Sequence, residues 1–222
     1  MTSKIKIYYH IWAENNYKSV FEAHMDHIKN SGLLDHVDSI NVGVISKTDI
    51  TDYLEKFEKV NILYLHSANT YEAKTLKHLY EDCCNSNEDF HTLYFHTKGV
   101  SRPKNEYVKD WNNMMTYFMV DKWKDCIKEL EEYDTVGCNL SFDNEKGKRL
   151  RVRHFSGNFW WANSDYIKKL NLGLLTKRRR GYTKRHSCEF WVLSNNDAKY
   201  KSIHNSGSNH YKSPYSLKIY TK

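Results

Sequence analysis

The order of the hydrophobic patterns is the feature of this sequence that most restricts its fold. Short runs rich in Ile, Val, Leu, Tyr and Phe, which are typical of strands, alternate with segments whose apolar residues recur every three or four positions. The strand-like runs cover residues 4–12, 39–46, 61–68, 91–98 and 134–142. The helical patterns cover residues 16–31, 71–84 and 107–132. This alternation predicts an α/β fold of the Rossmann-like type, with a mostly parallel central sheet flanked by helices.

The length and composition favour a single domain. The chain has 222 residues, and no segment rich in Pro, Gly or Ser divides it, so we expect residues 1–222 to fold as one unit. No apolar run reaches the roughly 18 residues of a transmembrane helix, and the first residues lack a signal-peptide pattern. The five cysteines lack the CxxC spacing of zinc and redox sites. These features predict a cytoplasmic protein with reduced thiols.

The positive charge is concentrated in two short segments. The formal net charge is +7, and the segments KGKRLRVR (146–153) and KRRRGYTKR (177–185) contain eleven basic residues and no acid. Such segments suit an anionic partner, which includes phosphates, nucleic acid and an anionic membrane surface. A solvated basic loop is the alternative interpretation.

Several common nucleotide-binding and catalytic motifs are absent. The sequence has no GxGxxG after its first strand-like run and no GxxxxGK[ST] phosphate loop. It also has no GxSxG nucleophile elbow, no HExxH zinc motif and no zinc-finger or RNP-type nucleic-acid motif. Any chemistry must therefore come from other segments.

The first candidate segment is LYFHTKG at residues 93–99, which ends an apolar strand-like run with three polar side chains and a glycine. In open α/β sheets, ligands bind at the carboxyl ends of the strands. Lys98 and Arg102 place two cations at such an end, which suits a diphosphate. A strand that runs into an ordinary surface turn is the alternative.

The second segment is HFSGNFWWA at residues 154–162. Its Ser-Gly pair permits a close approach of the backbone to a ligand, and aromatic faces are good platforms for sugars or bases. Trp160 and Trp161 cannot both face one side of a strand. We therefore expect one of them in the core and the other at a binding pocket.

Two further segments lie near the end of the chain. In CEFWVLS (188–194), Glu189 precedes a short apolar helical run, where it is either a carboxylate stabilised by the helix dipole or a general base. In HNSGSNHY (204–211), His204 follows a strand-like residue, and Gly207 permits the approach of an anion. A structural histidine is the alternative for His204.

These four segments, in this order, resemble the GT-A class of nucleotide-sugar glycosyltransferases. The chain is similar to the glycogenin and lipopolysaccharide galactosyltransferase family, and to the small glycosyltransferase domain of a chlorella virus. The abundance of Asn, Lys and Tyr also suits a large DNA virus or another AT-rich genome, which would place the protein in the host cytoplasm. The resemblance spans roughly residues 4–211. It implies a GT-A-like domain with a nucleotide-binding half at about residues 1–100 and an acceptor-side half at about 101–222.

The resemblance implies transfer of a sugar from a UDP- or dTDP-linked donor to a glycan hydroxyl, by an inverting reaction with Glu189 as general base. Retention of the anomeric configuration is the alternative outcome. The expected donor-binding residues are Tyr8, His10, Trp12, Asn69, Glu72, His96, Thr97, Lys98, Arg102, His204 and Gly207. The expected acceptor-binding residues are Ser156, Gly157, Asn158, Trp160 and Trp161.

The sequence departs from the family at the metal motif. The family has DxD where this chain has His96-Thr97-Lys98, and a charged lysine cannot chelate a divalent cation. We expect Lys98 to replace the cation by neutralising the leaving diphosphate directly. The alternative is that His96 and His204 hold a manganese ion, since imidazole is an accepted ligand.

Two other functions remain open from the sequence. The basic segments, with Tyr182 and Tyr211, could bind nucleic acid, because aromatic rings stack on bases and cations bind phosphates; we expect this partner less than a nucleotide sugar. The missing DxD also fits a glycosyltransferase-like protein without activity. The segment 177–185 could act as a lid or contact an anionic membrane peripherally.

Overall fold

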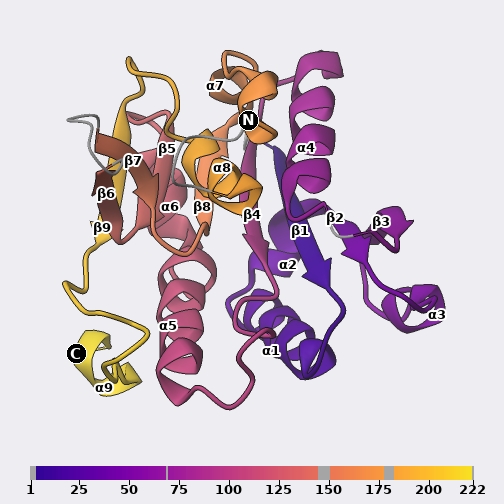
Figure 1. The fold of residues 1–222 in the computed structure, drawn as a ribbon. Coiled ribbons are helices and arrows are strands. Elements are labelled where there is room, and N and C mark those ends of the chain that lie inside the picture. The colour runs from indigo at the N-terminus through magenta and orange to yellow at the C-terminus, as the bar shows by residue number, and fades with distance from the viewer. Residues whose placement is uncertain (1–3, 69, 145–150, 178–182, 222) are drawn as a thin grey trace.

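The computed structural model describes residues 4–68, 70–144, 151–177 and 183–221. These residues form one α/β domain around a seven-stranded sheet with the strand order β3-β2-β1-β4-β8-β5-β9 (Figure 1). The strands are β1 (Lys4–Trp12), β2 (Val37–Ile45), β3 (Val60–His66), β4 (Phe90–His96), β5 (Thr135–Cys138), β8 (Trp160–Asn163) and β9 (Tyr200–His204). Strands β1 to β4 and the β5–β9 pair are parallel, and β8 runs antiparallel to β4 and β5. The predicted α/β fold with a mostly parallel sheet is confirmed.

Helices cover both faces of the sheet and bury two separate hydrophobic clusters. The helices are α1 (Tyr17–Asn30), α2 (Leu33–His36), α3 (Thr51–Leu54), α4 (Ala73–Asn85), α5 (Glu106–Thr116), α6 (Trp123–Glu129), α7 (Ser164–Ile167), α8 (Lys184–Trp191) and α9 (Leu217–Tyr220). One cluster joins α1, α5 and α6 to one face, and the other joins α4, α7 and α8 to the opposite face (Figure 1). A short 3₁₀ turn, Leu172–Leu175, packs with the second cluster.

Strand β1 shows how the sequence specifies the two faces. Ile7 and Tyr9 belong to the cluster under α1 and α5, whereas Tyr8 belongs to the cluster under α4. This alternation follows from the two-residue period of a strand. Because both faces are covered, the strand is apolar almost throughout, as expected for a central parallel strand. None of the helices in the described part of the chain is long and apolar enough to cross a bilayer.

The structure corrects the prediction of one long helix over residues 107–132. The helix α5 ends at Thr116, a π-helical turn follows at Tyr117–Asp121, and α6 begins at Trp123. A π-turn changes the backbone hydrogen-bond pattern, and two buried side chains bond to its carbonyls. Trp161 Nε1 donates to the carbonyl of Met119 at 2.7 Å, and Cys126 Sγ lies 3.3 Å from the carbonyl oxygen of Phe118.

The structure also divides the predicted strand over residues 134–142. Asn139 has a φ of 53°, in the left-handed region that asparagine tolerates better than most residues, and it separates β5 from β6 (Leu140–Asn144). Strand β6 then pairs antiparallel with β7 (Arg151–Phe155) in a separate two-stranded sheet. The β6–β7 hairpin returns the chain to β8, which enters the main sheet.

Close packing at Gly137 gives a prediction for stability. A Cβ atom on Gly137 would lie 2.4 Å from a ring carbon of Phe155, which is fully buried. Gly137→Ala should therefore reduce the free energy of unfolding by about 1–3 kcal/mol, measured by urea denaturation. Adding Phe155→Leu should recover part of this loss, because the smaller side chain leaves room for the methyl group. If the double variant loses as much unfolding free energy as the two single variants together, the two side chains do not conflict in this way.

Buried His24 gives a prediction for pH dependence. It lies between Tyr9 and Asn112, with its Nδ1 2.7 Å from the Tyr9 hydroxyl, and burial lowers its pKa to about 3. Since an unfolded histidine titrates near 6.5, the unfolded state binds the extra proton first, and stability falls as the pH drops below about 6.5. This single group accounts for a loss of up to about 2 kcal/mol between pH 7 and pH 5.

The variant His24→Gln isolates that contribution. Although it is less stable at pH 7, it should lose less unfolding free energy between pH 7 and pH 5 than the unmodified protein does, as measured by urea unfolding at the two pH values. Identical losses in the two proteins would show that His24 does not titrate in this way.

Candidate functional site

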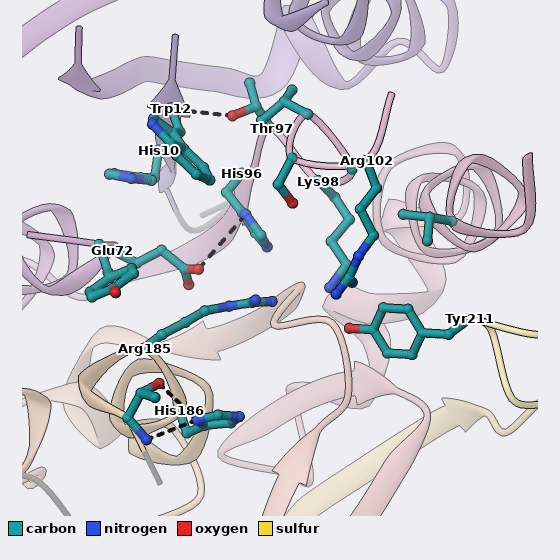
Figure 2. Close-up of a pocket in the computed structure, with 16 residues that line it drawn as sticks. His10, Trp12, Glu72, His96, Thr97, Lys98, Arg102, Arg185, His186 and Tyr211 are labelled. Atoms are coloured by element: carbon teal, nitrogen blue, oxygen red, sulfur yellow. Dashed lines mark hydrogen bonds and ion pairs between the residues drawn. The ribbon is translucent and has the colours of Figure 1, made fainter. Parts of the chain in front are cut away.

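A cavity of about 400 Å³ opens at the carboxyl ends of β1 and β4 (Figure 2). His10 and Trp12 line it from β1, and His96 lines it from β4. The loop that follows β4 supplies Lys98 and Arg102, the segment before α4 supplies Tyr71 and Glu72, and the start of α8 supplies Thr183, Arg185 and His186. Tyr211 lines it from the segment after β9. The cavity therefore lies where an open α/β sheet places its ligands.

Thr97 joins the two strand ends. Its backbone amide donates to the carbonyl of His10 at 3.0 Å, and its hydroxyl accepts from the backbone amide of Trp12 at 3.0 Å. The chain then turns at Gly99, whose φ of +93° suits glycine, and the amide of Arg102 donates to the Gly99 carbonyl at 2.7 Å. These bonds fix the backbone that carries Lys98 and Arg102.

Three cationic side chains enter the cavity from two different elements (Figure 2). Lys98 is only 6% exposed, and its Nζ lies 3.9 Å from the centre of the Trp111 ring. The Arg102 guanidinium lies 4.8 Å from the ring centre of Tyr211, and Arg185 lies 3.4 Å from Glu189 Oε1. Within the described ranges, Lys98 and Arg102 have no carboxylate at ion-pair distance.

Burial makes Lys98 an unusual cation. Removal from water lowers its pKa, and the negative charge of Glu189 acts in the opposite direction. The Trp111 ring offers a cation–π contact that replaces part of the lost hydration. A second ring, that of His210, stacks on the same indole with a centroid distance of 5.1 Å. An anion in the cavity would supply the partner that Lys98 lacks.

One acidic side chain, Glu72, lies in the cavity wall. It is 5% exposed, and it accepts hydrogen bonds from the Tyr94 hydroxyl at 3.1 Å and from the side-chain amide of Asn158. Asn158 accepts in turn from Trp160 Nε1 at 2.9 Å. These bonds hold the carboxylate in one orientation. Its oxygens can accept further hydrogen bonds, which suits the hydroxyl groups of a ligand.

Two histidines that line the cavity, His10 and His96, are neutral at neutral pH. Burial lowers the pKa of His10 to about 4, and burial together with the charge of Lys98 lowers the pKa of His96 to about 3. His96 Nε2 donates to the carbonyl of Gly157 at 3.1 Å, and His10 Nδ1 lies 2.9 Å from the Thr75 hydroxyl. His10 and His96 therefore add no positive charge to the cavity at neutral pH, whereas Lys98, Arg102 and Arg185 do.

The structure brings most of the predicted donor-binding residues together. His10, Trp12, Glu72, His96, Thr97, Lys98 and Arg102 all line the cavity. Tyr8 does not: it shares a face of β1 with His10 but lies further from the carboxyl end of the strand, where its hydroxyl bonds to Asp82 of α4. Asn69 lies outside the described residues.

His204 and Gly207 do not line this cavity. Two strands, β8 and β5, separate β4 from β9, which ends at His204. His204 stacks on Phe118 at 4.3 Å and bonds to the Tyr215 hydroxyl at 2.8 Å. Gly207 has a φ of +65°, but a Cβ atom there would meet nothing within 4 Å. The structure therefore does not bring His96 and His204 together as a metal pair.

The residues predicted to bind the acceptor have structural positions instead. Trp160 and Trp161 are both fully buried, on opposite faces of β8, and Asn158 is fully buried behind Glu72. Gly157 has a φ of +100° and accepts from His96, while Ser156 does not line the cavity. The prediction that one of the two tryptophans lines a pocket is wrong, because helices cover both faces of the sheet.

Glu189 also lies outside the cavity lining. It occupies α8 one turn after Arg185, and its carboxylate pairs with that guanidinium. Several lining residues were not expected at the donor site, among them Tyr71, Arg185 and Tyr211. Arg185 belongs to the basic segment 177–185 and Tyr211 to the segment 204–211, so both carried a signal, whereas Tyr71 carried none.

No divalent-cation site accompanies the cavity in the described part of the chain. There, no group of three or more His, Cys, Asp or Glu side chains is arranged to hold a metal ion. Lys98 also lines the cavity, and its ammonium cannot coordinate a metal. The donor set of the cavity therefore suits an anion and not a divalent cation.

Comparison with solved structures finds proteins of similar fold. A 4-diphosphocytidyl-2C-methyl-D-erythritol synthase from Anaerococcus prevotii DSM 20548 has a TM-score of 0.53 at 14% identity, over 97% of this chain and 94% of that chain. A CMP:2-keto-3-deoxy-manno-octonic acid synthetase in complex with CTP has a TM-score of 0.50 at 8% identity, over 91% of this chain and 90% of that chain. Because the sequence identities are this low, the similarity shows a shared fold and nothing more.

Neither of these two neighbours is described as a glycosyltransferase. No curated protein matches the sequence significantly. One protein family does match, over residues 8–174, which include both strand ends of the cavity and the Lys98 loop. The chain belongs to this family, which is described as a domain of unknown function (DUF8361).

Proposed function

We propose that the protein is a glycosyltransferase that binds a nucleotide sugar in the cavity at the ends of β1 and β4. The observation that carries this proposal is the buried Lys98, which has no carboxylate partner in the described ranges and lies in one cavity with Arg102 and Arg185. Fixed cations that face developing negative charge are a large contribution to catalysis. The order of the four sequence segments supports a GT-A-like function for this fold.

In this proposal, each part of the donor has a place in the cavity. The diphosphate is held by Lys98, Arg102 and Arg185. The carboxylate of Glu72 accepts hydrogen bonds from hydroxyl groups of the sugar. Trp12 and Tyr71 offer aromatic faces to the base. The half at about residues 1–100 supplies the base and sugar contacts, while the half at about 101–222 supplies Arg102, Arg185 and Tyr211.

The transfer itself exchanges one bond for another. The oxygen of an acceptor hydroxyl bonds to the anomeric carbon, and the bond from that carbon to the diphosphate oxygen breaks. The electron pair remains on the diphosphate, whose added charge the three cations stabilise, and the hydroxyl proton is released to solvent. Lys98 replaces the divalent cation in this scheme, so no step depends on a metal.

A second candidate function is nucleotidyl transfer. The fold shared with the two synthases favours it, since one of them is described in complex with CTP. The two reactions release different products. A glycosyltransferase releases a nucleoside diphosphate from a nucleotide sugar, whereas a nucleotidyltransferase releases pyrophosphate from a nucleoside triphosphate. Nucleic-acid binding would instead show an affinity that falls steeply with salt for many unrelated sequences.

Replacement of the buried lysine tests the diphosphate site. Lys98→Met should weaken the binding of UDP or dTDP, whichever stabilises the protein in a thermal-shift panel, by roughly 10- to 100-fold in isothermal titration calorimetry. Addition of EDTA should leave the affinity of the unmodified protein unchanged. The matched control is Lys109→Met, since Lys109 is an exposed lysine of α5 outside the cavity.

Two results would contradict this proposal. One is unchanged nucleotide affinity in Lys98→Met, which would remove Lys98 from the diphosphate site. The other is loss of binding in EDTA with recovery in manganese, which would show that a cation holds the diphosphate.

The substitution Glu189→Gln separates two roles for this carboxylate. Its pairing with Arg185 predicts a positioning role, so the variant should bind the diphosphate roughly two- to fivefold more weakly. Turnover with saturating nucleotide sugar should then fall by less than tenfold. If Glu189 is the general base, turnover should fall by about 10²–10⁴-fold with donor affinity unchanged. Calorimetry and a nucleotide-release assay distinguish these results.

A further inference from the structure

A second hollow, of about 680 Å³, adjoins the donor cavity. It is an open groove lined by residues 102–107 and by Tyr211. Arg102 and Tyr211 line both the groove and the cavity, so this stacked pair forms the wall between them. A molecule in the groove therefore lies next to the donor site.

The groove presents aromatic side chains to solvent. Tyr107 is 39% exposed and Tyr211 is 43% exposed, among the few large apolar side chains of the described residues with this much exposed surface. Exposed aromatic faces pack well against the C–H faces of pyranose rings, while the tyrosine hydroxyl remains available for hydrogen bonds. Lys104 and Arg102 also line the groove; neither has a carboxylate at ion-pair distance in the described ranges, and both offer donors to ring hydroxyls.

Hydrogen bonds hold the turn that leads into α5, whose first turn contains Tyr107. The Asn105 side chain accepts from the amides of Tyr107 at 3.0 Å and Val108 at 3.2 Å, which caps α5. The Asn105 amide donates to the carbonyl of Arg102 at 3.0 Å. The groove is thus built on the same turn that fixes Lys98 and Arg102 at the cavity.

We propose that this groove binds the acceptor saccharide, with a sugar ring against Tyr107 and its reacting hydroxyl directed past the Arg102–Tyr211 pair. This inference rests on the proposed glycosyltransferase function. It gives the acceptor a place that residues 156–161 do not provide, because they lie outside the cavity lining. Continuity with the donor cavity selects a saccharide over a protein partner, since the transferred sugar must reach its acceptor at the shared wall.

The test uses methyl glycosides of hexoses and 6-deoxyhexoses as probes, in saturation-transfer NMR with the full chain saturated with UDP. At least one probe should bind, and Tyr107→Ala should weaken it by roughly tenfold. Tyr107→Phe should retain the affinity, because the ring remains. Calorimetry should show the same UDP affinity in all three proteins, because Tyr107 does not line the donor cavity. Circular dichroism checks that the variants fold.

Each result has a defined meaning. Probe binding that is lost in Tyr107→Ala and kept in Tyr107→Phe supports the groove. Equal probe binding in Tyr107→Ala, or no probe binding while UDP binds, overturns the acceptor groove and leaves the donor site standing. If neither UDP nor dTDP binds, the proposed function fails, and with it the acceptor role of the groove.

Discussion

The parallel pairing of β1 with β4 is the constraint on which the candidate site depends. It brings His10 opposite His96, and the two bonds of Thr97 extend the pairing beyond the strand ends. The polar corner at Lys98 therefore sits at the ends of two paired central strands, over a core that is buried on both faces. A site built on strand ends in this way holds its charged groups within small tolerances.

The cost of burying Lys98 is the clearest physical sign of a ligand. A lysine is almost never fully buried without a paired charge, because the loss of hydration is large. Here the ammonium of Lys98 lies over the Trp111 ring. Glu189, the acid with the largest effect on its pKa, is paired with Arg185. The rest of the folded structure must offset the lost hydration of Lys98. A bound diphosphate would pair with the ammonium, so the buried charge would then favour binding.

Much of the fold and half of the site could be predicted from the sequence. The strand and helix periods located β1 to β4, and polar residues after β4 located the cavity. Other features depend on strand order, which spacing along the chain does not reveal. His204 ends an edge strand, so it lies away from His96 although both follow strands. Trp160 and Trp161 alternate as predicted, but α8 and the π-turn region cover both faces. The basic segment 177–185 indicated an anionic partner, but it did not show that the packing of α8 over the sheet brings Arg185 to this cavity.

A crystal structure of the protein with bound UDP tests the central claim most directly. The account predicts the diphosphate oxygens within hydrogen-bond distance of Lys98 Nζ and the Arg185 guanidinium, with no metal ion between them and the protein. A diphosphate bound elsewhere on the molecule, or held through a divalent cation at this corner, would contradict it.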